Sequence, residues 1–156
     1  MESKNKIPHL ITVVSFAVFI ILGLACATTN KTTVADSADT SKYNYVTIAN
    51  VMDYGGSTML MDLEVRIYNA LSTTRLNVIG DRQIDSLSES QKEQLLLVRF
   101  SASQSDARSV VSINFVDYLT GRPVASCSGS YGMGWSRDHD MRVAIDNAIV
   151  QINNLF

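Results

Sequence analysis

The chain has 156 residues, of which 46% are hydrophobic and 18% are charged, and its formal net charge at pH 7 is −2. This length suits a single domain, and the composition excludes a collagen-like chain, a coiled coil and a disulfide scaffold. The lack of a positive excess excludes a basic nucleic-acid-binding protein, so we expect no nucleic-acid partner.

The first residues are typical of a secretory signal. Lys4 and Lys6 precede an apolar run from Leu10 to Ala25. This run of about 16 residues is shorter than the ~20 that a membrane-spanning helix needs, and small residues stand at its end. We therefore predict a signal peptide over residues 1–25.

The end of this signal resembles the lipobox of bacterial lipoproteins. The residues there are Leu22, Gly23, Leu24, Ala25 and Cys26, with Gly23 where the motif usually has Leu, Val or Ile. The resemblance implies that Cys26 is acylated and becomes the first residue of the mature protein. A lipid would hold the chain on a membrane without a spanning helix. An ordinary signal cleaved after Ala25 and an uncleaved signal anchor are the alternatives.

Residues 26–42 are predicted to form a flexible tether behind the lipidated cysteine. From Ala27 onward they contain no aromatic residue and one branched aliphatic, Val34, so they offer too little apolar surface to order themselves. Random-coil scaling gives such a tether a reach on the order of 20–25 Å. Ala27 stands where enterobacterial lipoproteins retained at the inner membrane have Asp, and this resemblance implies the outer membrane, with the domain on its periplasmic face.

Residues 43–156 are expected to form one globular α/β domain of the α+β type. Apolar and β-branched segments predict strands over residues 43–51, 75–79, 95–102, 108–118 and 124–131. Helical spacing of apolar residues predicts a helix over about 58–72, a short one within 82–94, and a last one that begins at Ser136 or Asp138. The order β-α-β-(α)-β-β-β-α indicates two layers, with helices on one face of a mixed, mostly antiparallel sheet.

Small residues mark one face of the last predicted strand. Ala125, Cys127 and Gly129 alternate on that face, and serines occupy the other. We expect the last helix to approach the sheet closely there. Cys127 is then a buried, inert thiol, although it would be a candidate nucleophile if His139 lay beside it.

Two other patterns are weak candidates for binding chemistry. Gly129, Gly132 and Gly134 lie between a strand and a helix, but their spacing is not that of a dinucleotide fingerprint. Residues 138–140 are Asp-His-Asp, yet neighbouring helical side chains point in different directions, and acidic residues suit the start of a helix. We therefore expect no metal, no cofactor and no catalytic residue.

Three aromatic residues near the ends of the last hairpin are candidate partner contacts. They are Tyr118, Tyr131 and Trp135. Exposed aromatic side chains of this kind can contact a protein partner or a glycan. The alternative is that they pack over the edge of the sheet.

Most of residues 43–156 resemble a group of small envelope lipoprotein domains, and the carboxyl-terminal part carries the clearest pattern. Asp117, Thr120 and Gly121 form an Asp-x-x-Thr-Gly hairpin between two strands, and an alanine-rich amphipathic helix follows. This pattern is similar to that of the curli-secretion lipoprotein, the penicillin-binding-protein activator lipoproteins and the amino-terminal domain of the Tol β-propeller protein. The resemblance brings no catalytic residues.

It implies a non-enzymatic envelope protein that binds a protein partner or assembles with itself. Two alternatives stay open. One is a lipid-anchored ligand binder or enzyme with a pocket near Gly129–His139, lined by Asp117, His139 and Cys127. The other is a surface-exposed, adhesin-like lipoprotein.

Overall fold

The computed structural model describes residues 28–49, 57–132, 134 and 136–156. The predicted signal peptide, Cys26 and Trp135 lie outside the described residues. The strands are β1 (Thr29–Val34), β2 (Tyr45–Ile48), β3 (Asn77–Val78), β4 (Leu95–Gln104), β5 (Ser109–Asp117) and β6 (Pro123–Tyr131). The helices are the 3-10 helix η1 (Thr40–Lys42), α2 (Thr58–Ser72), α3 (Asp81–Ile84), α4 (Glu89–Lys92) and α5 (Arg137–Leu155).

The six strands form one mixed sheet in the order β1-β6-β5-β4-β2-β3. β4, β5 and β6 make an antiparallel meander, and β1 adds antiparallel to β6. β2 pairs in parallel with both β3 and β4. Parallel pairing is expected of β2 and β3, because these two strands flank the helix α2.

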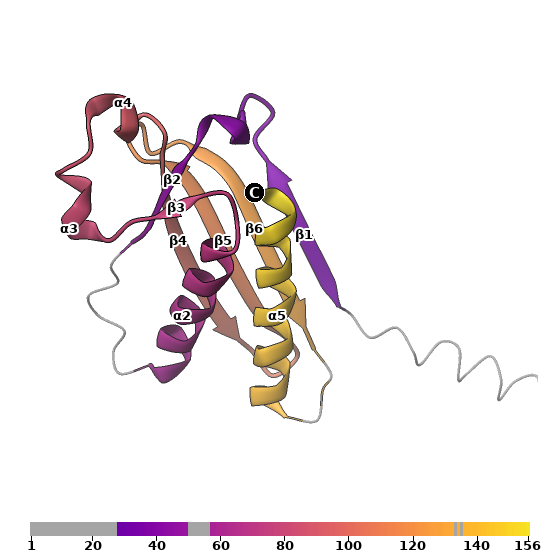
Figure 1. The fold of residues 1–156 in the computed structure, drawn as a ribbon. Helices are drawn as coiled ribbons and strands as arrows, with labels where there is room; N and C mark the ends of the chain where they lie inside the picture. The colour runs from indigo at the N-terminus through magenta and orange to yellow at the C-terminus, as the bar shows by residue number, and fades with distance from the viewer. Residues whose placement is uncertain (1–27, 50–56, 133, 135) are drawn as a thin grey trace, which may run out of the picture.

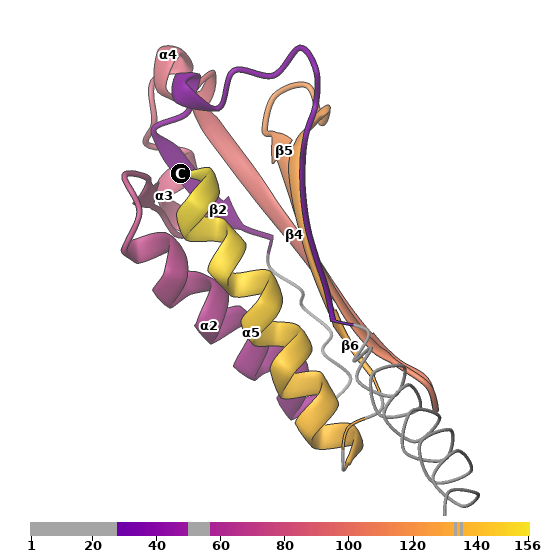
Figure 2. The same cartoon turned by 90° about the vertical axis from the view of Figure 1, so that its right-hand side faces the viewer.

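The helices α2 and α5 lie side by side on one face of this sheet, and none of the described helices covers the antiparallel half of the opposite face (Figures 1 and 2). The fold class and the two-layer arrangement predicted from the sequence are therefore confirmed. No helix among the described residues combines the length and the apolarity needed to cross a membrane.

α2 follows the pattern of its sequence. Ser57 caps it by accepting a hydrogen bond from the Leu60 N–H at 3.4 Å, which satisfies one of the free amides of the first turn. Its buried side chains are Leu63, Ile67, Ala70 and Leu71. Because these lie on one stripe, burial of that stripe against the sheet and α5 holds the helix in place.

The region expected to hold one short helix holds two single turns. α3 begins after Gly80, and α4 begins after Ser88. The Ser88 hydroxyl accepts from the Gln91 N–H at 3.3 Å, while the Gln91 side chain accepts from the Ser88 N–H at 2.9 Å. This reciprocal pair is a capping box, which satisfies two backbone amides at the start of α4.

α5 rests directly on the backbone of β6. A Cβ built on Gly129 would lie 2.2 Å from the Ala144 carbonyl oxygen and 2.5 Å from the Ala148 nitrogen. Only glycine leaves room for the helix at this point, which confirms the close approach predicted from the small residues of β6.

The tether predicted over residues 26–42 is wrong for most of the residues that the structure describes there. Residues 29–34 form β1, and residues 40–42 form η1. The physical reason is that an edge strand can be held by backbone hydrogen bonds to its neighbour, without burying side chains. All six residues of β1 are exposed, so its sequence has none of the alternation that usually marks a strand.

Candidate functional site

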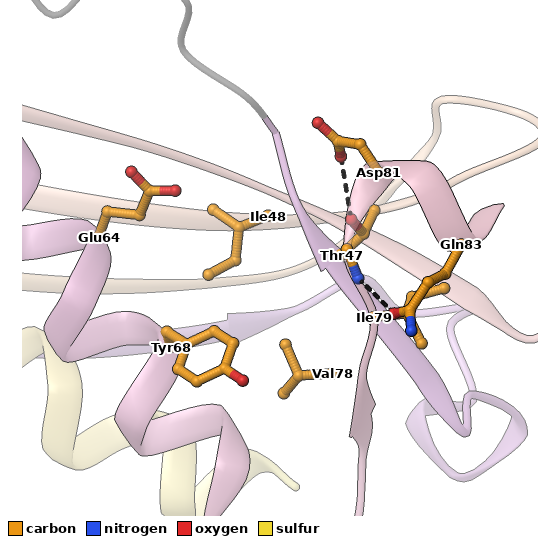
Figure 3. Close-up of a pocket in the computed structure, with 9 residues that line it drawn as sticks. Thr47, Ile48, Glu64, Tyr68, Val78, Ile79, Asp81 and Gln83 are labelled. Atoms are coloured by element: carbon orange, nitrogen blue, oxygen red, sulfur yellow. Dashed lines mark hydrogen bonds between the residues drawn. The ribbon is translucent and has the colours of Figure 1, made fainter.

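A surface pocket of about 410 Å³ opens at the carboxyl ends of the parallel strands β2 and β3 (Figure 3). Its wall residues come from β2, α2, β3 and the start of α3. They are Thr47, Ile48, Glu64, Tyr68, Val78, Ile79, Gly80, Asp81 and Gln83. Ligands of open α/β sheets commonly bind at the carboxyl ends of parallel strands, so this is one candidate site.

The polar wall of the pocket is partly organised by hydrogen bonds. The hydroxyl of Thr47, which is buried, donates to Asp81 Oδ1 at 3.4 Å. Gln83 Oε1 accepts from the Gly80 N–H at 3.0 Å. Glu64 and Tyr68 lie one turn apart on α2 and face the same hollow (Figure 3). The carboxylates of Glu64 and Asp81, the ring of Tyr68 and the aliphatic side chains of the wall together suit a ligand that is polar or cationic at one end and apolar at the other.

No motif in the sequence indicates that Thr47, Glu64, Tyr68 and Asp81 line one pocket. One feature of the sequence nevertheless points to this pocket. The expected parallel pairing of the first two domain strands places their carboxyl ends at one edge, and Asp81 follows one of these strands.

The second candidate site is the sheet face opposite α2 and α5. The register places Arg99, Asn114, Ser126 and Thr33 in one row across β4, β5, β6 and β1. The next row consists of Ser101, Ser112, Ser128 and Lys31. A groove of about 420 Å³ runs beside the first row.

These two rows combine two cations, Lys31 and Arg99, with hydroxyl and amide side chains that can donate or accept hydrogen bonds. The Ser126 hydroxyl donates to Asn114 Oδ1 at 2.9 Å, and the Asn114 NH₂ group takes no part in that bond. In the part of the chain that the structure describes, Lys31 and Arg99 have no ion-pair partner, and both are exposed. The open face (these two rows) therefore suits a partner that offers hydrogen-bond acceptors or negative charge.

Asp117 ties the hairpin after β5 to the start of β2. Its Oδ1 accepts from both the N–H and the hydroxyl of Thr120 at 2.9 Å. Its Oδ2 accepts from the Tyr43 hydroxyl at 3.0 Å and lies 3.6 Å from Lys42 Nζ. Gly121 closes the turn at φ +67°, a conformation that glycine adopts without a steric cost.

These contacts shift the pKa values of the Asp117 carboxyl group and the Tyr43 hydroxyl group. Burial raises the pKa of Asp117, but the hydrogen bonds from Thr120 and Tyr43 and the charge of Lys42 outweigh burial and lower it below its ordinary 3.8. Burial, together with the bond to Asp117, raises the pKa of Tyr43 to about 12. Both effects hold this cluster in one protonation state around neutral pH, as a structural element requires.

The alternative pocket lined by Asp117, His139 and Cys127 does not form. β5 and β6 are antiparallel, so Asp117 lies at one end of the hairpin, and His139 packs against Tyr131 at the other, with ring centroids 5.9 Å apart. Cys127 lies between them, buried under α5, and burial raises its pKa to about 11. A thiol in that state is a poor nucleophile.

The acidic residues at the start of α5 serve the helix. Ser136 caps α5 by accepting from the His139 N–H at 3.2 Å, and Asp140 Oδ2 accepts from the Gly134 N–H at 3.3 Å. Within residues 28–49, 57–132, 134 and 136–156, no three His, Cys, Asp or Glu side chains are grouped so that they could hold a metal ion. Asp138 and Asp140 in the first turn also suit the helix dipole.

The aromatic residues predicted to contact a partner are not gathered into one surface. Tyr118 follows β5 and Tyr131 ends β6, so they lie at opposite ends of the hairpin. Both are half-buried, and Tyr131 packs against the core cluster. Trp135 lies outside the described residues. Their role in partner contact stays a prediction, for each residue separately.

The similarity of this chain to known proteins is limited to the fold. No protein-family model matches the sequence, and no curated protein matches it. Two solved structures are PelC dodecamers from Paraburkholderia phytofirmans, one of them of a variant. The variant is 15% identical over 81% of this chain and 98% of its own, with a TM-score of 0.44. The other is 17% identical over 83% and 97%, with a TM-score of 0.46.

A third similar structure is a PDZ domain protein from Parabacteroides distasonis. It is 12% identical, and the match covers 85% of this chain and 38% of that protein, with a TM-score of 0.52. At this identity the two chains share the arrangement of strands and helices alone.

Proposed function

We propose that this chain is a lipid-anchored protein of the bacterial cell envelope that binds a partner or assembles, without catalysis. The sequence up to Cys26 supports the anchor. The observation that carries the binding role is the open face, where Arg99 and Lys31 stand among serine, threonine and asparagine side chains. A partner with acceptor groups or negative charge would find donors there in two regular rows.

The binding role is tested by cross-linking and mass spectrometry on native membranes, comparing the unchanged chain with Arg99→Glu. The matched control is Arg142→Glu, which makes the same charge change at an exposed position of α5. We expect Arg99→Glu to lose the main cross-linked partner and Arg142→Glu to keep it. Equal cross-linking of both variants would contradict a role for the open face.

The anchor is tested separately with Cys26→Ser. We expect this variant to leave the membrane fraction, because it cannot carry the acyl chains. Intact-mass measurement of the unchanged protein should show the lipid on Cys26. A Cys26→Ser protein that stays on the membrane after its signal has been removed would argue against lipid anchoring.

A second candidate function is the binding of a small ligand in the pocket at the carboxyl ends of β2 and β3. The position and the volume of about 410 Å³ favour it. The test is a thermal-shift screen of small amines and other polar metabolites against the unchanged chain, Asp81→Asn and the control Asp62→Asn, which alters an exposed residue of α2. A stabilising compound whose effect Asp81→Asn abolishes would support this function. A stabilisation that survives Asp81→Asn would place the compound elsewhere.

A further inference from the structure

The edge strand β1 is held to the domain by its backbone, with little help from the core. It pairs with β6 over six positions, from Thr29 opposite Ser130 to Val34 opposite Ala125. None of its residues belongs to the core cluster, and Val34, its one aliphatic residue, is 40% exposed. Its release therefore returns little apolar surface to water, and the hydrophobic effect does little to oppose it.

Most of the contacts that close the core under β6 come from α5, and the Thr32 hydroxyl of β1 adds one bond to Gln151 Oε1. α5 covers the inner face of β6, with the backbone of Gly129 against Ala144 and Ala148. Gln151 donates from Nε2 to the carbonyl oxygens of Ser128 at 2.8 Å and Asn147 at 2.7 Å. Of these contacts, only the bond from Thr32 to Gln151 involves β1. Loss of β1 would thus expose the hydrogen-bonding edge of β6 while the rest of the domain remained folded.

A short hinge connects β1 to the rest of the molecule. Residues 35–39 turn the chain, and the Ala38 N–H donates to the Ala35 carbonyl at 2.9 Å. These residues are small or acidic and none is buried. If this turn straightens, β1 points away from its own domain and toward a neighbour, which is the usual geometry of strand exchange.

We propose that the edge of β6 is a strand-binding surface whose partner is β1 of a second copy, exchanged reciprocally between the two. The second copy's segment satisfies the same register, because its residues are identical. Its Thr32 would stand opposite Cys127 and would donate to Gln151 Oε1, a bond of 2.6 Å within one chain. The hydrogen bonds between β1 and β6 that are lost on release are thereby regained on exchange.

The proposal rests on the proposed function in one respect, the lipid on Cys26. Anchored copies share one membrane surface, and this raises their effective concentration for exchange. Two residues, 27 and 28, separate Cys26 from β1. An exchanged β1 would therefore hold each domain close to the anchor of the other copy.

The test places single cysteines on two differently tagged full-length chains expressed in the same cells. One chain carries Lys31→Cys and the other carries Ser128→Cys, positions that face each other in the β1–β6 register. Directly opposed residues of antiparallel strands have Cα atoms ~4.5–5.5 Å apart, which suits a disulfide. Membranes are treated with a mild oxidant, and the disulfide between the two tags is identified by peptide mapping.

Exchange predicts a disulfide between the two tagged chains. The matched control pairs Lys31→Cys with Ser112→Cys, one strand further along the same row, and should give at least five-fold less. A chain with both Lys31→Cys and Ser128→Cys shows that the pair can oxidise in the folded protein. If this double variant forms its disulfide while the mixed chains give no more than the Ser112→Cys control, the proposal is overturned.

Mass measurements on the same membranes distinguish a failure of the exchange proposal from a failure of the proposed lipid anchor. Intact mass reports the lipid on Cys26, independently of any disulfide. A specific disulfide between chains that lack the lipid would support exchange and refute the anchor. Lipidated chains without that disulfide, beside an oxidised double variant, would refute exchange and leave the anchor standing.

Discussion

The hydroxyl of Tyr43 donates a hydrogen bond of 3.0 Å to Oδ2 of Asp117, a residue 74 positions further along the chain. This bond joins the start of β2 to the turn after β5, two segments that no local pattern connects. Both residues are buried, with 5% and 8% of their surface exposed. Their contact is therefore a long-range structural bond that can be tested by unfolding.

Tyr43→Phe is expected to lower the free energy of unfolding by about 1.5–3 kcal/mol, because it removes a hydrogen bond to a buried carboxylate. The comparison is Tyr45→Phe, which removes a bond of 3.0 Å from the Gln91 amide to a half-buried hydroxyl. That neutral bond should be worth about 1 kcal/mol or less. Urea unfolding of the three proteins measures both values, and equal losses would contradict a special role for Asp117.

Stability should fall at acid pH partly through Asp117. Its pKa is lowered in the folded chain relative to the ordinary 3.8, so its contribution is complete above that value and is lost as the pH falls through the lowered pKa. Asp39, whose pKa is lowered by hydrogen bonds from Ser41, acts in the same direction. Unfolding measured between pH 2 and 7 should give a smaller acid loss for Asp117→Asn. An unchanged acid slope in that variant would refute this assignment.

Most of the fold could be predicted because burial leaves a pattern in the sequence. The apolar stripe of α2 and the alternation of β5 follow from which side faces the core. β1 could not be predicted in this way, because all its side chains are exposed and its only requirement is a free backbone edge on β6. Polar composition indicated a tether where the structure has a strand.

Gly129→Ala is expected to cost about 3 kcal/mol or more, because the added Cβ would meet the backbone of α5 at 2.2 Å and neither element can move aside cheaply. Gly121→Ala should cost about 1 kcal/mol, since its φ is +67° but the space beside it is open. Gly80→Ala has no such conflict and should change stability by less than about 0.5 kcal/mol. Thermal and urea unfolding would rank the three variants, and any other order would contradict the close packing described for Gly129.

Cys127 should resist alkylation at neutral pH in the folded chain. It is fully buried and its pKa is raised to about 11, so the reactive thiolate is scarce and inaccessible. Iodoacetamide labelling followed by peptide mapping, which separates Cys127 from Cys26, should show modification only as urea unfolds the protein. Fast labelling without urea would mean that the β6–α5 layer opens readily.

The candidate sites were harder to predict than the fold, since each is assembled from separate elements. The pocket brings Thr47 from β2, Tyr68 from α2 and Asp81 from α3 together, and no spacing in the sequence connects them. Ser126 and Ser128 of β6 were placed correctly on the face away from the core. Their alignment with Arg99 and Lys31 depends on the register of four strands, which side-chain patterns alone do not determine.

The position of β6 between a core strand and a peripheral one has a consequence for its amide protons. Along an antiparallel strand, successive N–H groups point alternately to the two neighbours, here β5 and β1. Protons directed toward β5 should exchange with solvent only when the whole domain unfolds. Those directed toward β1 should exchange whenever the edge strand detaches. β6 would thus record two opening events of different free energy in alternating residues of a single strand.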